Sequence, residues 1–206
     1  MLRAALVLLA ASAALYVRYY ALPPILAQFP LAPELAFLLA LPLLLLPLLG
    51  IRPRDAGITV GKTGQCLKFV TLALFVSLPF LFFAAQLPAF NSYYPLFGWA
   101  RDSPLNLAAY EVLILSLMLT TEFFFRGFLM MGMRGIGQPG ALLVQNIPYT
   151  LVHLGKPMLE LPASFFAGLA FGWIDFKAGS VLPSTILHWS INVAFDAFCI
   201  YFYFSR

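Results

Sequence analysis

Long apolar runs, separated by short segments rich in proline, glycine and charge, dominate this sequence. Most of the runs approach the roughly 20 residues that a helix needs to cross the hydrocarbon core of a bilayer. Hydrophobic residues make up 62% of the 206 positions and charged residues only 10%, whereas an average soluble domain has about 25% charged residues. The sequence therefore predicts an all-α, polytopic transmembrane helix bundle, with the lipid bilayer as its surroundings.

The length allows about seven spans with short connections and leaves no room for a separate soluble domain. We therefore expect a single integral membrane domain over residues 1–206. The first run could pass for a signal peptide, but in a chain this apolar we interpret it as a retained span. The expected spans cover approximately residues 4–22, 35–51, 67–87, 105–126, 138–154, 162–177 and 181–203.

The net charge of +4 and the pI of about 9.2 raise the question of a nucleic-acid partner. The twelve lysines and arginines are scattered rather than gathered into a stripe, so no nucleic acid is expected. The most basic connector, residues 52–68, predicts a cytoplasmic loop by the positive-inside rule. The N-terminus with Arg3 then also lies in the cytoplasm, as do Arg134 and Lys177. Arg101, Lys156 and Arg206 fall on the other side.

The two cysteines, Cys66 and Cys199, are far apart and have neither CxxC nor Cys/His spacing. This pattern indicates neither a zinc knuckle nor a disulfide framework. We interpret both as packing residues.

Ionisable side chains inside an apolar span are costly, and they mark candidate functional sites. Glu122 and Arg126 are four residues apart in one predicted helix, so they share a face within pairing distance. The pair has two interpretations that this spacing leaves open. It can be an ion pair that makes the span insertable, or part of a site.

Both histidines of the chain, His153 and His188, lie in strongly apolar surroundings. Asn192 follows His188 by four residues and shares its helix face. A single histidine inside a membrane is usually a core residue bonded to a backbone carbonyl. The occurrence of both histidines in membrane segments that also contain Glu122, Arg126 and Asn192 favours one shared polar site.

Together these residues contain what hydrolysis of an amide bond requires. A carboxylate in a low-dielectric site can act as general base towards water. A histidine can orient that water or protonate the leaving amine, and a histidine and an asparagine can donate to the developing oxyanion. The same set of residues would also suit a proton relay or an ion pathway.

Three motifs in this order resemble the CAAX protease and bacteriocin-processing (CPBP) family, which includes the type II CAAX prenyl endopeptidases. The EExxxR, FxxxH and HxxxN motifs are matched by residues 121–126, 149–153 and 188–192. The resemblance covers residues 115–194 and implies a catalytic core over about residues 105–204. One departure is Tyr149, which stands where the family has phenylalanine. The other is Thr121, which stands where the family has its first glutamate.

The resemblance implies an intramembrane endopeptidase that activates water with a glutamate. Its substrates would be membrane-associated or lipidated proteins, cut near the C-terminus or in a leader, and its location a bacterial inner membrane. By position, the implied catalytic residues are Glu122, its partner Arg126, the water or substrate ligand His153, and His188 with Asn192 on the oxyanion side. Because Thr121 replaces the glutamate usually assigned as the base, a pseudo-protease that serves as an immunity or scaffold protein is the alternative. A small proton-coupled transporter is a third hypothesis, and it lacks the expected internal repeat.

Glu122, His153 and His188 could nominally form a His/His/Glu zinc site. The sequence has no HExxH motif, and Arg126 would compete with a cation for the carboxylate. We therefore expect no metal and no cofactor. A common depth for the site residues further requires that residues 134–140, which contain three glycines, form a loop.

Overall fold

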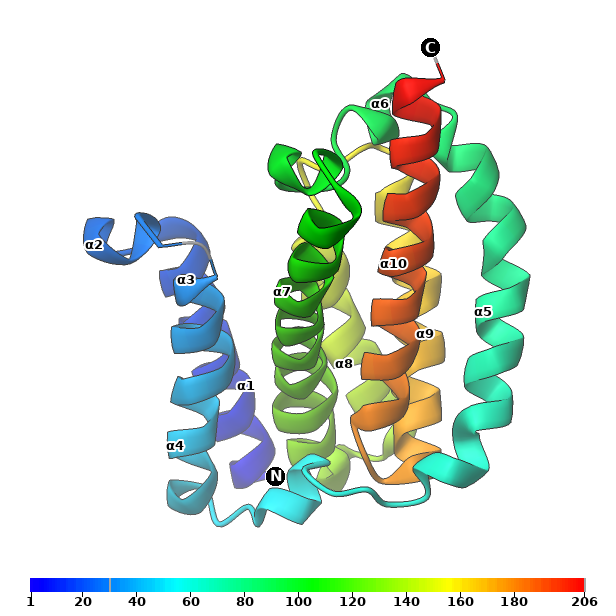
Figure 1. Cartoon of the computed structure of the whole chain (residues 1–206). Coiled ribbons are helices and arrows are strands. Elements are labelled where there is room, and N and C mark those ends of the chain that lie inside the picture. The colour runs from blue at the N-terminus through cyan, green and yellow to red at the C-terminus, as the bar shows by residue number, and fades with distance from the viewer. Residues whose placement is uncertain (30, 206) are drawn as a thin grey trace.

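The computed structural model describes residues 1–29 and 31–205, and these form helices that run roughly side by side (Figure 1). The long helices are α1 (Leu2–Tyr20), α4 (Leu41–Leu48), α5 (Thr63–Ala85), α7 (Pro104–Glu122), α8 (Gln138–Leu151), α9 (Glu160–Ala178) and α10 (Leu182–Phe204). Two π-helical segments extend them: η1 (Leu35–Ala40) links α3 (Ala32–Glu34) to α4, and η4 (Phe123–Met131) continues α7. Short helices occupy the connections: α2 (Pro24–Ala27), η2 (Pro53–Ala56), α6 (Pro88–Asn91), η3 (Gly98–Arg101) and η5 (Arg134–Ile136).

Among the described residues, four helices are long and apolar enough to cross a membrane, namely Leu2–Tyr20, Thr63–Ala85, Pro104–Met131 and Leu182–Phe204. This confirms the prediction of an all-α bundle built for the bilayer. The count of seven spans is not confirmed. The helix Ala32–Leu48 is apolar but shorter, and the 14 residues of α8 rise only about 21 Å. Helix α9 is longer, but it contains Glu160, Asp175 and Lys177.

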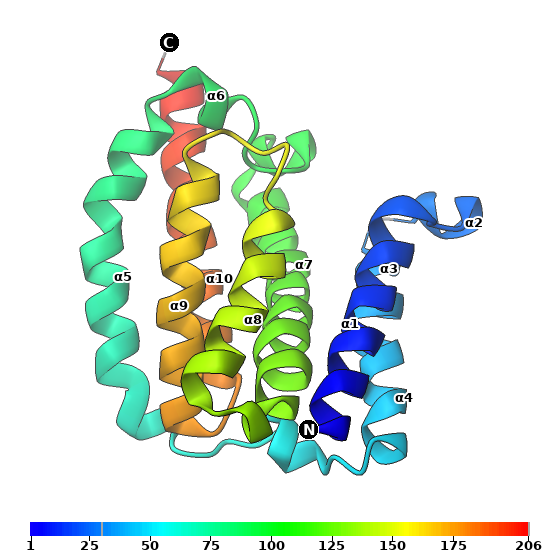
Figure 2. The ribbon, with the colours of Figure 1, turned by 180° about the vertical axis from the view of Figure 1, so that it is seen from behind.

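The helices divide into a hairpin and a bundle. Helices α1 and α4 form the hairpin at one side, and α5, α7, α8, α9 and α10 form the bundle (Figures 1 and 2). Helix α10 packs against α5, α7 and α9, and the hairpin contacts the bundle through η1 and η4. All nine residues of η4 are buried. The segment that follows Glu122 is therefore a rigid centre, against which both parts of the molecule pack.

Local sequence signals set the ends of the helices that carry the candidate residues. Ser103 caps α7, because its hydroxyl oxygen accepts from the backbone N–H of Asn106 at 3.1 Å, and Pro104 follows at the first helical position. Helix α9 ends at Gly179, whose φ of 65° lies in the left-handed region. The segment expected to be a loop is the short helix η5 with Gly137 after it, and α8 begins at Gln138.

Polar and small residues hold α8 against α9. The Gln145 Nε2 donates to the carbonyl oxygen of Gly168 at 3.3 Å, and the Asn146 Nδ2 donates to that of Phe165 at 3.0 Å. Gly168 lies so close to α8 that a Cβ atom there would overlap the Asn146 Oδ1 and come within 2.7 Å of the Tyr149 ring. Small residues at such crossings allow close backbone approach between membrane helices.

We expect Gly168→Ala to destabilise the protein by about 1–3 kcal/mol, the usual cost of overpacking, because Tyr149 or α9 must move. The measurement is thermal unfolding in detergent. Gly64→Ala is the matched control, since a Cβ at Gly64 in α5 meets no atom within 4 Å, and alanine favours a helix by roughly 0.5–1 kcal/mol over glycine. Equal stability of the two variants would contradict the close packing of α8 on α9.

Candidate active site

The centre of the candidate site is a buried ion pair at the junction of α7 and η4. The Arg126 Nε lies 3.2 Å from Oε2 of Glu122, and the Arg126 Nη1 donates to Oε1 at 3.3 Å. Neither side chain has any exposed surface. A π-helical segment is rare and occurs frequently at functional sites. A buried charge pair requires good geometry and further hydrogen bonds to offset its desolvation.

His188, in the second turn of α10, supplies one such hydrogen bond. Its Nδ1 lies 2.6 Å from Oε1 of Glu122. Because Arg126 favours the ionised carboxylate, which can only accept, Nδ1 must carry the proton. The Nε2 of His188 is then the nitrogen available to a ligand. The ring packs against Phe171, with 5.3 Å between the centroids, so its orientation is fixed on two sides.

Tyr149, near the end of α8, connects this group to the second histidine. The Arg126 guanidinium lies over the Tyr149 ring at 3.8 Å from the centroid, and the His153 ring packs on the same ring at 5.0 Å. The Nδ1 of His153 lies 2.8 Å from the carbonyl oxygen of Tyr149. Because a carbonyl oxygen only accepts, Nδ1 donates, and Nε2 of His153 carries a free lone pair.

Asn192 lies one turn beyond His188 on α10. Its Nδ2 donates to the backbone carbonyl of His188 at 2.9 Å and faces the Met118 sulfur at 3.5 Å. These contacts use the amide hydrogens only in part, since a thioether is a weak acceptor. Asn192 therefore keeps an N–H that can donate a hydrogen bond to a stronger acceptor, such as an oxyanion.

A cavity of about 1380 Å³, lined by helices of the bundle and by residues on the hairpin side, brings these residues together. His153, His188, Asn192 and Thr121 line it, together with an otherwise mostly apolar and aromatic wall. Glu122 and Arg126 are fully buried behind that wall. The five residues predicted from the sequence thus form one connected group, but Glu122 reaches the cavity only through His188. From the segment 121–126, Thr121 and Phe125 line the cavity, and Thr121 is the polar one of the two.

Sequence reasoning missed a polar cluster at the mouth of the cavity. Glu160, the first residue of α9, accepts from the Tyr94 hydroxyl at 2.8 Å and from the Lys156 ammonium at 2.7 Å. Its Oε1 lies 3.9 Å from Nε2 of His153. Burial, and then the carboxylate of Glu160, raise the pKa of Tyr94, so the phenol keeps its proton and donates. The only signal in the sequence is the spacing of four between Lys156 and Glu160.

A second missed group is Asp175 with Ser184. The fully buried Asp175 accepts from the Ser184 backbone N–H at 3.0 Å and from its hydroxyl at 2.5 Å. This satisfies a free N–H in the first turn of α10 and ties that turn to the end of α9. The contact fixes the position of α10, and with it that of His188.

No group of three His, Cys, Asp or Glu side chains in the part of the chain that the structure describes is arranged to hold a metal ion. The expectation of a metal-free site stays a prediction.

The three motifs and the cavity that joins them can be compared with known families. Residues 103–194 match the family model described as type II CAAX prenyl endopeptidase Rce1-like. This Rce1-like segment begins at the N-cap of α7 and ends two residues after Asn192, so it contains all five predicted site residues. The match confirms the resemblance to the CPBP family and supports an endopeptidase of the CAAX protease type.

No curated protein and no solved structure matches the chain.

We expect Arg126→Met to destabilise the protein by about 3–5 kcal/mol, because it leaves the carboxylate of Glu122 buried without its cation. The double variant Glu122→Gln/Arg126→Met removes both charges and should recover a large part of that loss. Thermal unfolding in detergent measures both. A single variant that is as stable as the double variant would contradict the ion pair.

Proposed function

We propose that this protein is an intramembrane endopeptidase that cleaves membrane-associated or lipidated proteins near the C-terminus or in a leader. The observation that carries the proposal is the arrangement of His153, His188 and Asn192 around one cavity, within an Rce1-like segment of a membrane helix bundle. An apolar cavity of this size is large enough for an extended peptide, and its few polar groups would then face the peptide backbone.

We assign a role to each histidine from the orientation of its ring. Nε2 of His153 has a free lone pair and accepts a hydrogen bond from the attacking water. With Nδ1–H of His188 bonded to Glu122, the imidazolium form of His188 presents its Nε2–H to the substrate carbonyl oxygen together with the amide of Asn192. Water adds to the carbonyl carbon and gives its proton to His153. The C–N bond then breaks, and the proton passes from His153 to the leaving amine.

In this scheme Glu122 acts through His188 and never touches the water. It is a positioning residue, because its hydrogen bond fixes the ring of His188 and its negative charge lies beside that ring while charge develops on the substrate. Thr121, which faces the cavity, makes no side-chain hydrogen bond to any described residue, whereas the Thr120 hydroxyl donates to the carbonyl oxygen of Ser116 at 2.8 Å. The open space beside Thr121 is where the family's first glutamate would point.

Cleavage of co-expressed membrane-tail substrates tests the proposal. We expect cleavage by the wild type and a loss of about 10²–10³-fold in His188→Ala, the cost of removing one oxyanion donor. Glu122→Ala should lose activity to a similar extent, since His188 then lacks its partner. Expression is matched by immunoblotting of the membrane fraction. If the wild type does not cleave and Thr121→Glu does, the scaffold serves for binding, as in the pseudo-protease alternative.

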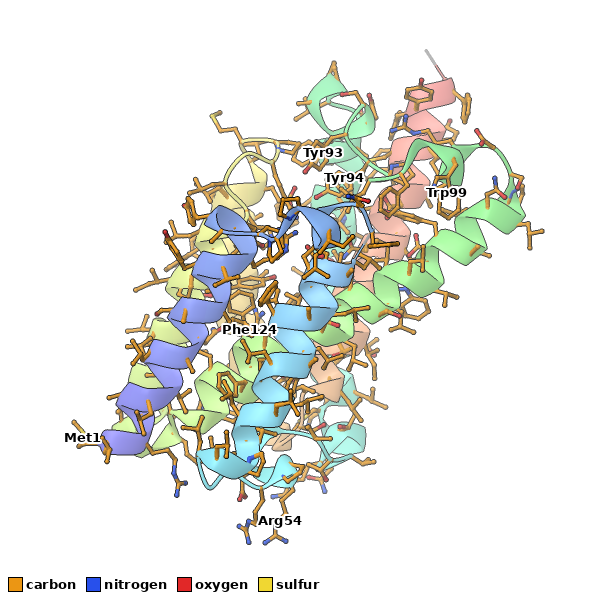
Figure 3. All side chains as sticks on the ribbon, turned by 90° about the vertical axis from the view of Figure 1, so that its left-hand side faces the viewer. Met1, Arg54, Tyr93, Tyr94, Trp99 and Phe124 are labelled. Atoms are coloured by element: carbon orange, nitrogen blue, oxygen red, sulfur yellow. The ribbon has the colours of Figure 1, made fainter. Side chains whose placement is uncertain are left out.

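The distribution of charge supports an orientation in the membrane. One end of the molecule has seven basic residues, Arg3, Arg52, Arg54, Lys62, Lys68, Arg134 and Lys177. Among the described residues of the other end, Arg18 and Lys156 pair with Glu34 and Glu160, and Arg101 donates to backbone carbonyls. Figure 3 shows Met1 and Arg54 at the first end and Tyr93, Tyr94 and Trp99 at the second. We propose that the basic end is cytoplasmic.

This orientation has a consequence for the substrate. The connections of the other end contribute Tyr93, Tyr94, Gly155 and Lys156 to the cavity wall, and none of the seven basic residues lines it. With the basic end in the cytoplasm of a bacterial inner membrane, the cavity mouth faces the extracytoplasmic side. The proposal then favours exported proteins with a membrane-anchored tail over cytoplasmic prenylated proteins.

Labelling of single cysteines in intact cells tests the orientation without any assay of activity. In the background Cys66→Ala/Cys199→Ala, we expect a membrane-impermeant maleimide to label Ser92→Cys directly. The matched variant Gln65→Cys, at the exposed start of α5, should react only after the membrane is permeabilised. The reverse pattern would place the cavity mouth in the cytoplasm.

A further inference from the structure

A carboxylate lines the cavity at a position other than residue 121, where the family has its first glutamate. Thr121 brings no charge to the wall, and Glu122 is buried behind it. Among the described residues, the acids that line the cavity are Glu34 and Glu160. Glu34 is paired with Arg18 of the hairpin. Glu160 faces His153, the histidine whose free lone pair is available to water.

The distance between Glu160 and His153 fits a shared water molecule. Oε1 of Glu160 and Nε2 of His153 are 3.9 Å apart, which is too long for a direct hydrogen bond. Both atoms are acceptors, since Nδ1 of His153 carries the proton of that ring. A water molecule that donates one hydrogen to each atom satisfies both. Its lone pairs then point away from the two acceptors, free to attack a carbonyl carbon.

The carboxylate of Glu160 is held in place by two donors from different segments. Tyr94, from the connection between α6 and η3, donates to it at 2.8 Å, and Lys156 donates at 2.7 Å. The Glu160 side chain is 18% exposed, so water reaches it from the mouth. A catalytic group contributes most to the reaction rate when its position is fixed before the substrate binds. Glu160 meets this condition, because these contacts exist in the free protein.

We propose that Glu160 and His153 together hold and activate the attacking water, so that Glu160 replaces the glutamate absent at position 121. The inference rests on the proposed peptidase function. As the water oxygen bonds to the carbonyl carbon, one O–H bond breaks and its proton goes to Nε2 of His153. The second hydrogen stays on that oxygen and remains hydrogen-bonded to Glu160. The C–O double bond opens to an oxyanion held by His188 and Asn192. The oxyanion then collapses, the C–N bond breaks, and His153 returns the proton to the amine.

The first test is the variant Glu160→Gln, which keeps the shape but donates where the carboxylate accepts. We expect kcat to fall by about 10²–10⁴-fold, the usual contribution of general acid–base catalysis, because the water is no longer oriented to give its proton to His153. KM should change little. Asp102→Asn is the control, because it removes an exposed carboxylate that does not line the cavity and should leave kcat unchanged. Thermal unfolding of both variants establishes that they fold. If Glu160→Gln does not fold, Glu160→Asp, which keeps the charge on a shorter side chain, is used in its place.

The second test is rescue from the motif position. Thr121→Glu, introduced into Glu160→Gln, returns a carboxylate to the same cavity, and we expect kcat to recover at least tenfold. A purely structural role of Glu160 at the mouth would give no such recovery. An active wild type with unchanged kcat in Glu160→Gln, or without recovery in the double variant, overturns this inference alone. Absence of cleavage by the wild type overturns the proposed function and the inference with it.

Discussion

The buried charge of Glu122 is the interaction on which the rest of this structure depends. A carboxylate without exposed surface in a membrane bundle is tolerated only with a cation and hydrogen-bond donors around it. Arg126 supplies the cation from the next turn, and His188 supplies a donor from α10. The same contacts that make the charge tolerable fix the ring of His188. Stability and site geometry therefore come from one set of contacts.

Tyr149 extends this constraint to the second histidine. Its ring lies against the Arg126 guanidinium on one side and His153 on another, and its carbonyl oxygen accepts from His153. The aromatic position of the FxxxH motif is therefore a physical link between the first and second motifs. The close approach at Gly168 keeps Tyr149 in place. A change in the α8–α9 crossing should therefore change the positions of both histidine side chains.

The sequence was sufficient to predict which residues pair within one helix. It was insufficient to predict which side chains face the cavity. The spacing of four correctly related Glu122 to Arg126 and His188 to Asn192, because helical periodicity alone decides such pairs. Adjacent helical residues point roughly 100° apart, so whether Thr121 or Glu122 faces the cavity depends on how α7 is rotated in the bundle. That rotation is set by tertiary packing of η4, which local pattern does not reveal.

Glu160 shows the same limit more strongly, since its neighbours come from two connections that are far apart in the sequence. Tyr94 is 66 residues away in the chain, and His153 and Lys156 lie in the turn before α9. Only the fold brings an interfacial glutamate over a histidine at the mouth of an apolar cavity. A cavity wall of many helices gives more than one position from which a carboxylate can reach the same water. The loss of a motif glutamate is therefore compatible with retained hydrolysis wherever another helix places its carboxylate beside the histidine that holds the water.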